Sequence, residues 1–238
     1  MGNSLKCQNV ENGEEIIHKI LSTMNIKEIP CTRAYDEFNK CIDYNNKEDN
    51  IQINKSLYTN YINALIGHNS YRDLQFKFFD SLQIREPKII GVIVVLLSQG
   101  SKNEKSKLLT EIYNRYYDNL KLVLNTVIDV FSSYCVTLFM EPLGKDSVSM
   151  LGEVYSEDRI QKLAEKIIGN FNGVQTKYFS KSVGNNNDYS KIKKINELMI
   201  SEFFELSLDQ LNGEYMRNWL YEEYLKDNQN KNNNFCIY

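Results

Sequence analysis

The sequence contains few of the residues that interrupt helices. Only three prolines and eleven glycines occur in 238 residues. Because these residues mark turns, and because an all-β fold needs many turns, their scarcity favours a helical fold. Hydrophobic residues make up 42% of the chain, which is enough for a core in one large domain or two small ones.

Metal-binding and redox motifs are also scarce. The two histidines, His18 and His68, are too few and too far apart in sequence for a zinc site. The five cysteines have no paired spacing, which is typical of free thiols in a reducing compartment. No phosphate-binding glycine loop, nucleophile elbow or zinc-helix motif occurs. We therefore predict a protein that is not an enzyme and that needs no cofactor.

The charge balance is close to neutral and slightly acidic. The formal net charge is −3 and the isoelectric point is near 5.6. Such a chain gives no reason to expect a nucleic acid as its partner. The first residues also lack the apolar segment of a signal peptide, so we expect a cytoplasmic protein.

The longest apolar run, residues 89–97, is the stretch around which the rest of the chain is organised. Nine residues are too few to span a bilayer, which takes about 20 residues. The run suits a buried strand or a buried helix. After it, Ser101 and Glu104 have the spacing of a capping box, which predicts that a helix begins there. Leu109 and Ile112 then continue with helical spacing.

Helical periodicity appears along most of the remaining chain. It predicts helices over residues 14–24, 34–42, 57–66, 71–82, 120–140, 156–168, 189–206 and 208–225. Residues 141–153 are predicted to be a linker and residues 170–188 a loop, because both are rich in glycine or asparagine. Trp219 is the expected buried anchor of the last helix. The predicted organisation is a flexible tail over 1–12, a domain over 13–145, a smaller helical region over 146–226 and a disordered Asn-rich tail over 227–238.

The polar stretch from Asp43 to Asn54 lies between two predicted helices, which is the layout of an EF-hand. With Ile51 at the apolar eighth position, Lys55 replaces the bidentate carboxylate of a calcium loop. A cation there opposes a divalent ion, so we predict an EF-hand-like fold without its calcium ligands. A shifted register offers Asp43, Asn45 and Asp49 as ligands, and a functional calcium sensor using this loop is the alternative.

The sequence begins with MGNSLKC, which suggests lipid attachment. Gly2 can accept a myristoyl group once Met1 is removed, although Lys6 replaces the usual Ser or Thr. Cys7 offers a second anchor through palmitoylation, which matters because a single myristoyl chain binds a membrane only marginally. An unmodified, disordered tail is the alternative.

A family resemblance comes from two stretches. The sequence VVLLSQGSKNEKSKLLTEIYN, residues 94–114, resembles the linker between the paired EF-hands of calcium-sensor-like proteins. Together with the opening MGNS, it resembles the N-terminal region of mTOR-associated-type TLDc-domain proteins, over about half of the chain and without the TLDc domain. The resemblance implies a myristoylation signal, a degenerate EF-hand-like region and an association with lysosomal membranes and TOR signalling. It also implies that residues 89–97 form the exit helix of an EF-hand.

These observations predict an all-α protein with EF-hand-like helical pairs followed by a smaller helical region. Its expected function is that of a non-enzymatic adaptor, cytoplasmic or peripheral on a membrane, that binds an amphipathic helix of a protein partner in an apolar groove. Each expected groove residue also suits an ordinary core position. The expected groove residues are Phe78, Phe79, Val94, Leu97 and Phe131.

Overall fold

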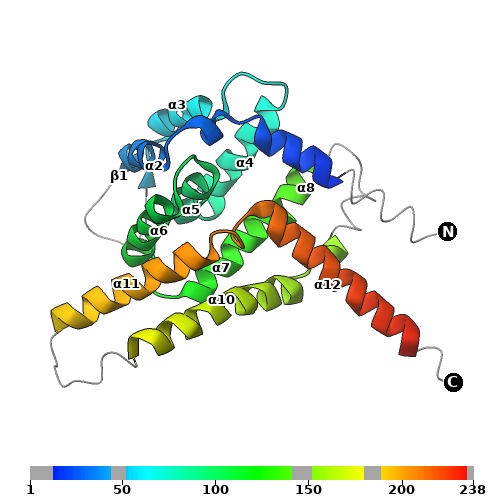
Figure 1. Ribbon diagram of the computed structural model, residues 1–238. Helices are drawn as coiled ribbons and strands as arrows, with labels where there is room; N and C mark the ends of the chain where they lie inside the picture. The colour runs from blue at the N-terminus through cyan, green and yellow to red at the C-terminus, as the bar shows by residue number, and fades with distance from the viewer. Residues whose placement is uncertain (1–12, 44–51, 141–151, 180–188, 235–238) are drawn as a thin grey trace.

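A computed structural model describes residues 13–43, 52–140, 152–179 and 189–234, and the chain in these ranges is mainly helical (Figure 1). This confirms the predicted all-α class. The first half contains a helix over residues 13–22, η1 (Asn25–Glu28), α2 (Cys31–Lys40), β1 (Ile42–Asp43), β2 (Gln52–Ile53), α3 (Lys55–Ile66), α4 (Arg72–Arg85), α5 (Pro87–Leu97) and α6 (Lys102–Tyr116). The second half contains α7 (Leu120–Asp129), η2 (Val130–Tyr134), α8 (Cys135–Met140), α10 (Glu157–Phe179), α11 (Tyr189–Ser207) and α12 (Gly213–Asn234).

Several helix boundaries follow directly from local side-chain chemistry. Pro87 occupies the first turn of α5, where its missing N–H costs nothing. The predicted capping box begins α6: the Ser101 hydroxyl accepts from the Glu104 N–H, and the Glu104 carboxylate accepts from the Ser101 N–H at 2.8 Å. Asn54 and Asn119 cap α3 and α7 in a similar way, with their side-chain oxygens accepting first-turn N–H groups.

Helix α5 is the central element of the core, as the apolar run predicted. Its residues 89–95 are buried, and it packs against α2, α4, α6 and α7. Gly91 permits the contact with α2, because a Cβ atom there would lie 3.3 Å from the Phe38 ring and 3.4 Å from the Tyr35 ring. The predicted alternative of a strand for this run is therefore wrong.

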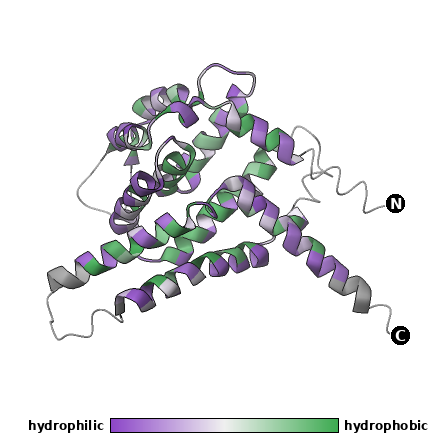
Figure 2. Cartoon of the chain, viewed as in Figure 1, coloured by the Kyte–Doolittle hydropathy of each residue, from purple (hydrophilic) through white to green (hydrophobic). Residues whose placement is uncertain are grey.

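The C-terminal helices share the core of the N-terminal part. Helix α11 packs on α6, and α10 packs on both α7 and α11 (Figure 1). Apolar and polar residues alternate along α10 and α11 (Figure 2). One continuous cluster of buried side chains runs from Ile17 to Leu220. The predicted boundary at residue 145 therefore does not separate two cores.

Two predicted irregular segments are helical instead. Helix α10 continues to Phe179, through residues 170–179 that were predicted to lie in a loop. Helix α12 continues to Asn234, so residues 227–234 of the predicted disordered tail are helical. Asparagine-rich composition misled both predictions. In α10, the buried Val174 and the contact of Phe171 with Phe203 outweigh a weak local propensity. In α12, the helix continues from its packed first turns.

One long apolar helix is interrupted by a π-helical turn. Helices α7 and α8 are joined by the π-turn η2, so residues 120–140 form a continuous helical stretch. Its segment Leu120–Phe139 is long and apolar enough to cross a membrane, with a mean hydropathy of 1.6, but 56% of it is buried inside the protein. The core helix of a protein passes the same test, and the structure confirms the helix predicted over residues 120–140.

Short β-type pairings fix two junctions. Ile42 pairs with Ile53 and Asp43 with Gln52 in an antiparallel hairpin, so the two ends of the predicted calcium loop bond to each other. Elsewhere, Gln99 forms a parallel bridge to the start of α2: its carbonyl accepts from the Cys31 N–H at 2.7 Å. This bridge holds the α5–α6 junction against α2.

Candidate functional site

The predicted partner groove is mostly core. Phe78, Phe79, Val94 and Phe131 are each at most 1% exposed, and only Leu97 is half-buried. The Phe78 ring lies 5.2 Å from the Phe79 ring, centroid to centroid, in an edge-to-face contact. These side chains stabilise the fold, and they are too deeply buried to form an open groove for a partner helix.

The other predicted site residues fall at the edges of the described structure. Gly2 and Cys7, the predicted lipid anchors, and Asn45 and Asp49, of the alternative calcium site, lie outside the described residues. Asp43 is in strand β1. In the described ranges, no three His, Cys, Asp or Glu side chains gather closely enough to hold a metal ion. Lipidation and calcium binding therefore stay predictions.

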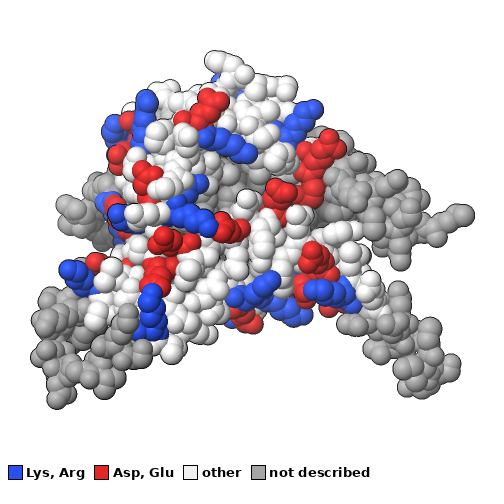
Figure 3. Space-filling view, viewed as in Figure 1, with Lys and Arg blue, Asp and Glu red and all other residues white. Residues whose placement is uncertain are grey.

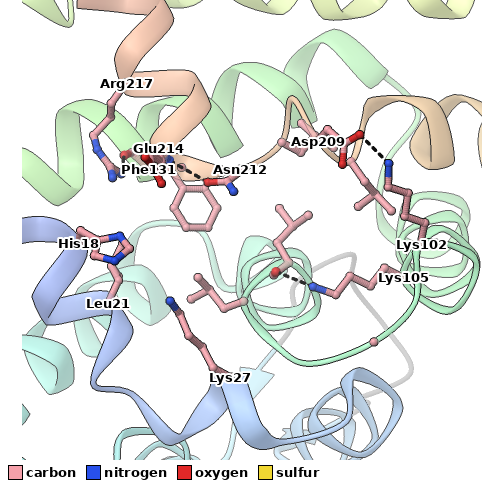
Figure 4. Close-up of a pocket in the computed structure, with 16 residues that line it drawn as sticks. His18, Leu21, Lys27, Lys102, Lys105, Phe131, Asp209, Asn212, Glu214 and Arg217 are labelled. Carbon is pink, nitrogen blue, oxygen red and sulfur yellow. Dashed lines mark hydrogen bonds and ion pairs between the residues drawn. The ribbon is translucent and has the colours of Figure 1, made fainter. Parts of the chain in front are cut away.

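A cavity of about 320 Å³ lies where five segments meet, and we call it the central cavity (Figure 4). The segments are the helix over 13–22, η1, the α5–α6 junction, the π-turn, and the connection from α11 into α12. Two of the five predicted groove residues, Leu97 and Phe131, belong to its lining. The complete lining is His18, Leu21, Lys27, Leu96, Leu97, Gly100, Lys102, Lys105, Phe131, Leu208, Asp209, Leu211, Asn212, Gly213, Glu214 and Arg217.

The apolar part of the lining comes from leucines and one aromatic ring. Leu96 and Leu97 are half-buried at the end of α5, where the helix meets the cavity. Leu208, also half-buried, lies on the opposite connection between α11 and α12. These partly exposed side chains can gain burial when a ligand covers them, which is a favourable contribution of about 25 cal/mol per Å² of apolar surface.

Lysine side chains form much of the polar part. The Lys105 ammonium donates to the Leu96 carbonyl at 2.9 Å, which places a cation at the carbonyl end of α5. Burial lowers the pKa of Lys105. Lys102 forms an ion pair with Asp209 across the cavity mouth. Lys27 is exposed on η1 and extends toward the cavity (Figure 4).

A buried arginine forms the wall on the α12 side. Arg217 is 2% exposed, and its Nε donates to both carboxylate oxygens of Glu14, at 2.7 and 2.8 Å. Its Nη1 group donates to the Phe131 carbonyl at 2.8 Å. Phe131 lies in the π-turn, where i→i+5 bonding disturbs the regular carbonyl pattern. Arg217 therefore joins the N-terminal helix, the π-turn and α12.

The first turn of α12 completes the cavity. The Asn212 side-chain oxygen accepts from the Glu214 N–H at 2.9 Å, which is the usual capping arrangement at a helix start. Gly213 permits close packing, because a Cβ atom there would lie 3.0 Å from both the Phe131 ring and the Arg217 guanidinium. The positive end of the α12 dipole therefore lies at the cavity.

The chemistry of the lining suits binding. Among the described residues that line the central cavity there is no cysteine, serine or threonine side chain. Four lining residues have basic side chains, Lys27, Lys102, Lys105 and Arg217, and two, Asp209 and Glu214, have carboxylates. A cavity with an apolar floor and a few charged groups around it is the usual form of a ligand site.

Two other hollows on the described surface offer fewer charged groups around an apolar floor. One lies between α7 and the start of α10, where the buried Oδ1 of Asn125 has no donor among the described residues. The other lies on α11, beside the exposed side chains of Leu198 and Leu206. Lysines and carboxylates are interspersed over the face shown in Figure 3, without a large field of one sign.

Sequence reasoning missed most of the cavity residues. His18, which the sequence spacing excluded as a zinc ligand, lies exposed at the rim. Trp219 was expected to anchor the last helix, but it is half-buried, and Arg217 occupies the buried position. The helical spacing was the signal that could have indicated this position, because Arg217 lies on the same face of α12 as the buried Met216 and Leu220.

Comparison with known proteins gives no relative. No family model matches the chain, and neither the curated proteins nor the solved structures contain a match. The resemblance to EF-hand and TLDc-type proteins therefore stays a prediction from the sequence.

Proposed function

We propose that this protein is a non-enzymatic adaptor that binds a segment of a partner protein at the central cavity. The observation that carries the proposal is the convergence of half-buried Leu96, Leu97 and Leu208 on a cavity that is open to solvent. Exposed or half-exposed apolar side chains at the centre of a concave site, with charged groups around them, are the usual anchor region of a protein interface.

The size of the cavity limits what enters it. A volume of about 320 Å³ is at the lower end of the range for ligand pockets, roughly 300 to 1,000 Å³. A few side chains of a peptide segment suit this volume better than a large cofactor. This proposal replaces the predicted groove, because it keeps the half-buried Leu97 as a contact and leaves the buried Phe78, Phe79, Val94 and Phe131 to the core.

Selection of peptides tests the proposal. Short random peptides are displayed on phage and selected on the full-length protein, and the enriched peptides are measured by fluorescence anisotropy. Leu208→Trp fills the cavity from a half-buried position, whereas Leu206→Trp adds the same ring at an exposed position two residues away. We expect the first variant to weaken binding by at least about tenfold and the second to leave it unchanged.

Two results would overturn the proposal. One is the failure of selection to enrich any peptide. The other is equal binding of the enriched peptides to the Leu208→Trp and Leu206→Trp variants, which would place them outside the central cavity. Circular dichroism of both variants confirms that any loss of binding does not come from loss of the helical fold.

A further inference from the structure

Some of the basic side chains that line the central cavity have a carboxylate partner, and others do not. Lys102 has Asp209 as its ion-pair partner, and Arg217 has Glu14. Lys27 and Lys105, by contrast, have no carboxylate within ion-pair distance among the described residues. The chain as a whole carries a net charge of −3, so two uncompensated cations at one cavity are a local departure from its acidic character.

The two lysines come from different elements and flank the same leucines. Lys27 is on η1 and Lys105 is on α6, on either side of the end of α5 that carries Leu96 and Leu97 (Figure 4). The Lys105 ammonium is held in place by its bond to the Leu96 carbonyl. Because an ammonium has three N–H donors, that bond leaves donors for a ligand.

The α12 side of the cavity also favours an anionic ligand. The first turn of α12, with Asn212 and Gly213 in the lining, presents the positive end of a helix dipole. Glu214 is the opposing group, an exposed carboxylate at the rim. The lining therefore combines an apolar floor with an excess of positive charge, and it fits an anionic group that is attached to an apolar one.

We propose that the partner segment presents an acidic side chain next to a leucine-like or phenylalanine-like side chain, with the carboxylate received between Lys27 and Lys105 and the apolar side chain seated on Leu96, Leu97 and Leu208. This inference rests on the proposed function and names the chemistry of the partner. The apolar contact supplies most of the affinity. The lysines supply selectivity and faster association, because complementary charge at an interface acts mainly on these two properties.

The experiment uses the selected peptides and charge variants of the full chain. We expect an acidic residue adjacent to a Leu or Phe in the enriched sequences. Lys27→Glu should weaken the binding of these peptides by at least about tenfold, since like charges placed together at an interface are strongly unfavourable. Lys105→Met should weaken their binding as well. Lys19→Glu and Lys107→Glu are the matched controls, because both lysines are exposed on neighbouring elements and lie outside the cavity lining.

A second selection, performed on the Lys27→Glu variant, tests the sign of the charge directly. We expect it to enrich peptides in which Lys or Arg replaces the acidic residue. Binding of the acidic peptides to the wild-type protein should also weaken as salt is added, because salt screens exposed charges.

The inference and the proposed function fail in different ways. If Leu208→Trp abolishes binding but the enriched peptides are neutral or basic, the inference is overturned and the adaptor function remains. It is also overturned if Lys27→Glu changes the affinity no more than Lys19→Glu does. If Leu208→Trp has no effect, the proposed function fails, and the inference fails with it.

Discussion

Arg217 and Glu14 are 203 positions apart in the sequence and form a partly buried ion pair, with both Glu14 oxygens within 2.8 Å of the Arg217 Nε. Tyr155 adds a third contact, since its hydroxyl donates to Glu14 at 3.2 Å. The pair connects the first described helix to the last. It also fixes one wall of the central cavity, because Arg217 lines the cavity and holds the Phe131 carbonyl.

Removal of the arginine should destabilise the fold strongly. Arg217→Met removes the arginine donor from both the Glu14 carboxylate and the Phe131 carbonyl, and we expect a loss of about 3 kcal/mol in the free energy of unfolding. Urea denaturation followed by circular dichroism measures it. In the Glu14→Gln/Arg217→Met double variant the loss should be smaller than the sum of the two single losses. A loss below about 1 kcal/mol for Arg217→Met would show that the pair is not a structural link.

The capping box of α6 should make stability depend on pH. Hydrogen bonds from the Ser101 N–H and hydroxyl hold the pKa of Glu104 below its ordinary value. A carboxyl with a depressed pKa stabilises the folded state above its unfolded pKa, about 4.3, and loses this contribution as the pH falls through the folded value. We therefore expect Glu104→Gln to be less stable than wild type at neutral pH, and the difference to disappear in acid. Thermal unfolding across this pH range checks it, and a difference that grows in acid would contradict it.

Phe78 tests the distinction between core and groove. Its ring contacts those of Phe79, Tyr134 and Phe139, with centroids 5.2, 5.8 and 5.7 Å away. Phe78→Ala should lower the free energy of unfolding by about 3 to 5 kcal/mol, as expected for a cavity left in a packed core. Urea denaturation of the variant provides the value. A nearly neutral substitution would return Phe78 to the list of candidate partner contacts.

The sequence predicted the elements whose local chemistry is strong. The capping box at Ser101 and the apolar run of α5 each have a local signature, and each appears in the structure as expected. Glycine is unfavourable inside a helix, but Gly91 in that run has a tertiary reason: the α2 rings leave little room for a Cβ atom. A single sequence does not reveal such a close approach.

The central cavity could not be predicted for the same physical reason. Its lining comes from five segments that are distant in sequence, and contacts such as Lys105 to Leu96 depend on how α5 and α6 meet. Leu97 and Phe131 were identified by their apolar character alone. That property does not separate a buried position such as Phe131 from a half-buried one such as Leu97.

The described cysteines should be unreactive in the folded protein. Burial raises the pKa of Cys41 to about 11 and that of Cys135 to about 12, and it also raises the pKa of Cys31. Because the thiolate is the reactive form, a variant with Cys7→Ser and Cys236→Ser should react slowly with a thiol reagent near pH 8. All three remaining thiols should react once the protein is unfolded in urea. Rapid reaction of the native variant would contradict the buried placement of these side chains.

Methyl NMR tests the central claim most directly, because it locates a bound peptide on individual leucines. The protein is labelled at its leucine methyl groups and titrated with the tightest of the selected peptides. We predict saturable shifts at Leu96, Leu97 and Leu208, which line the central cavity, and none at the exposed Leu57, Leu122 and Leu198. Shifts confined to the exposed leucines, with the cavity leucines unchanged, would contradict the account.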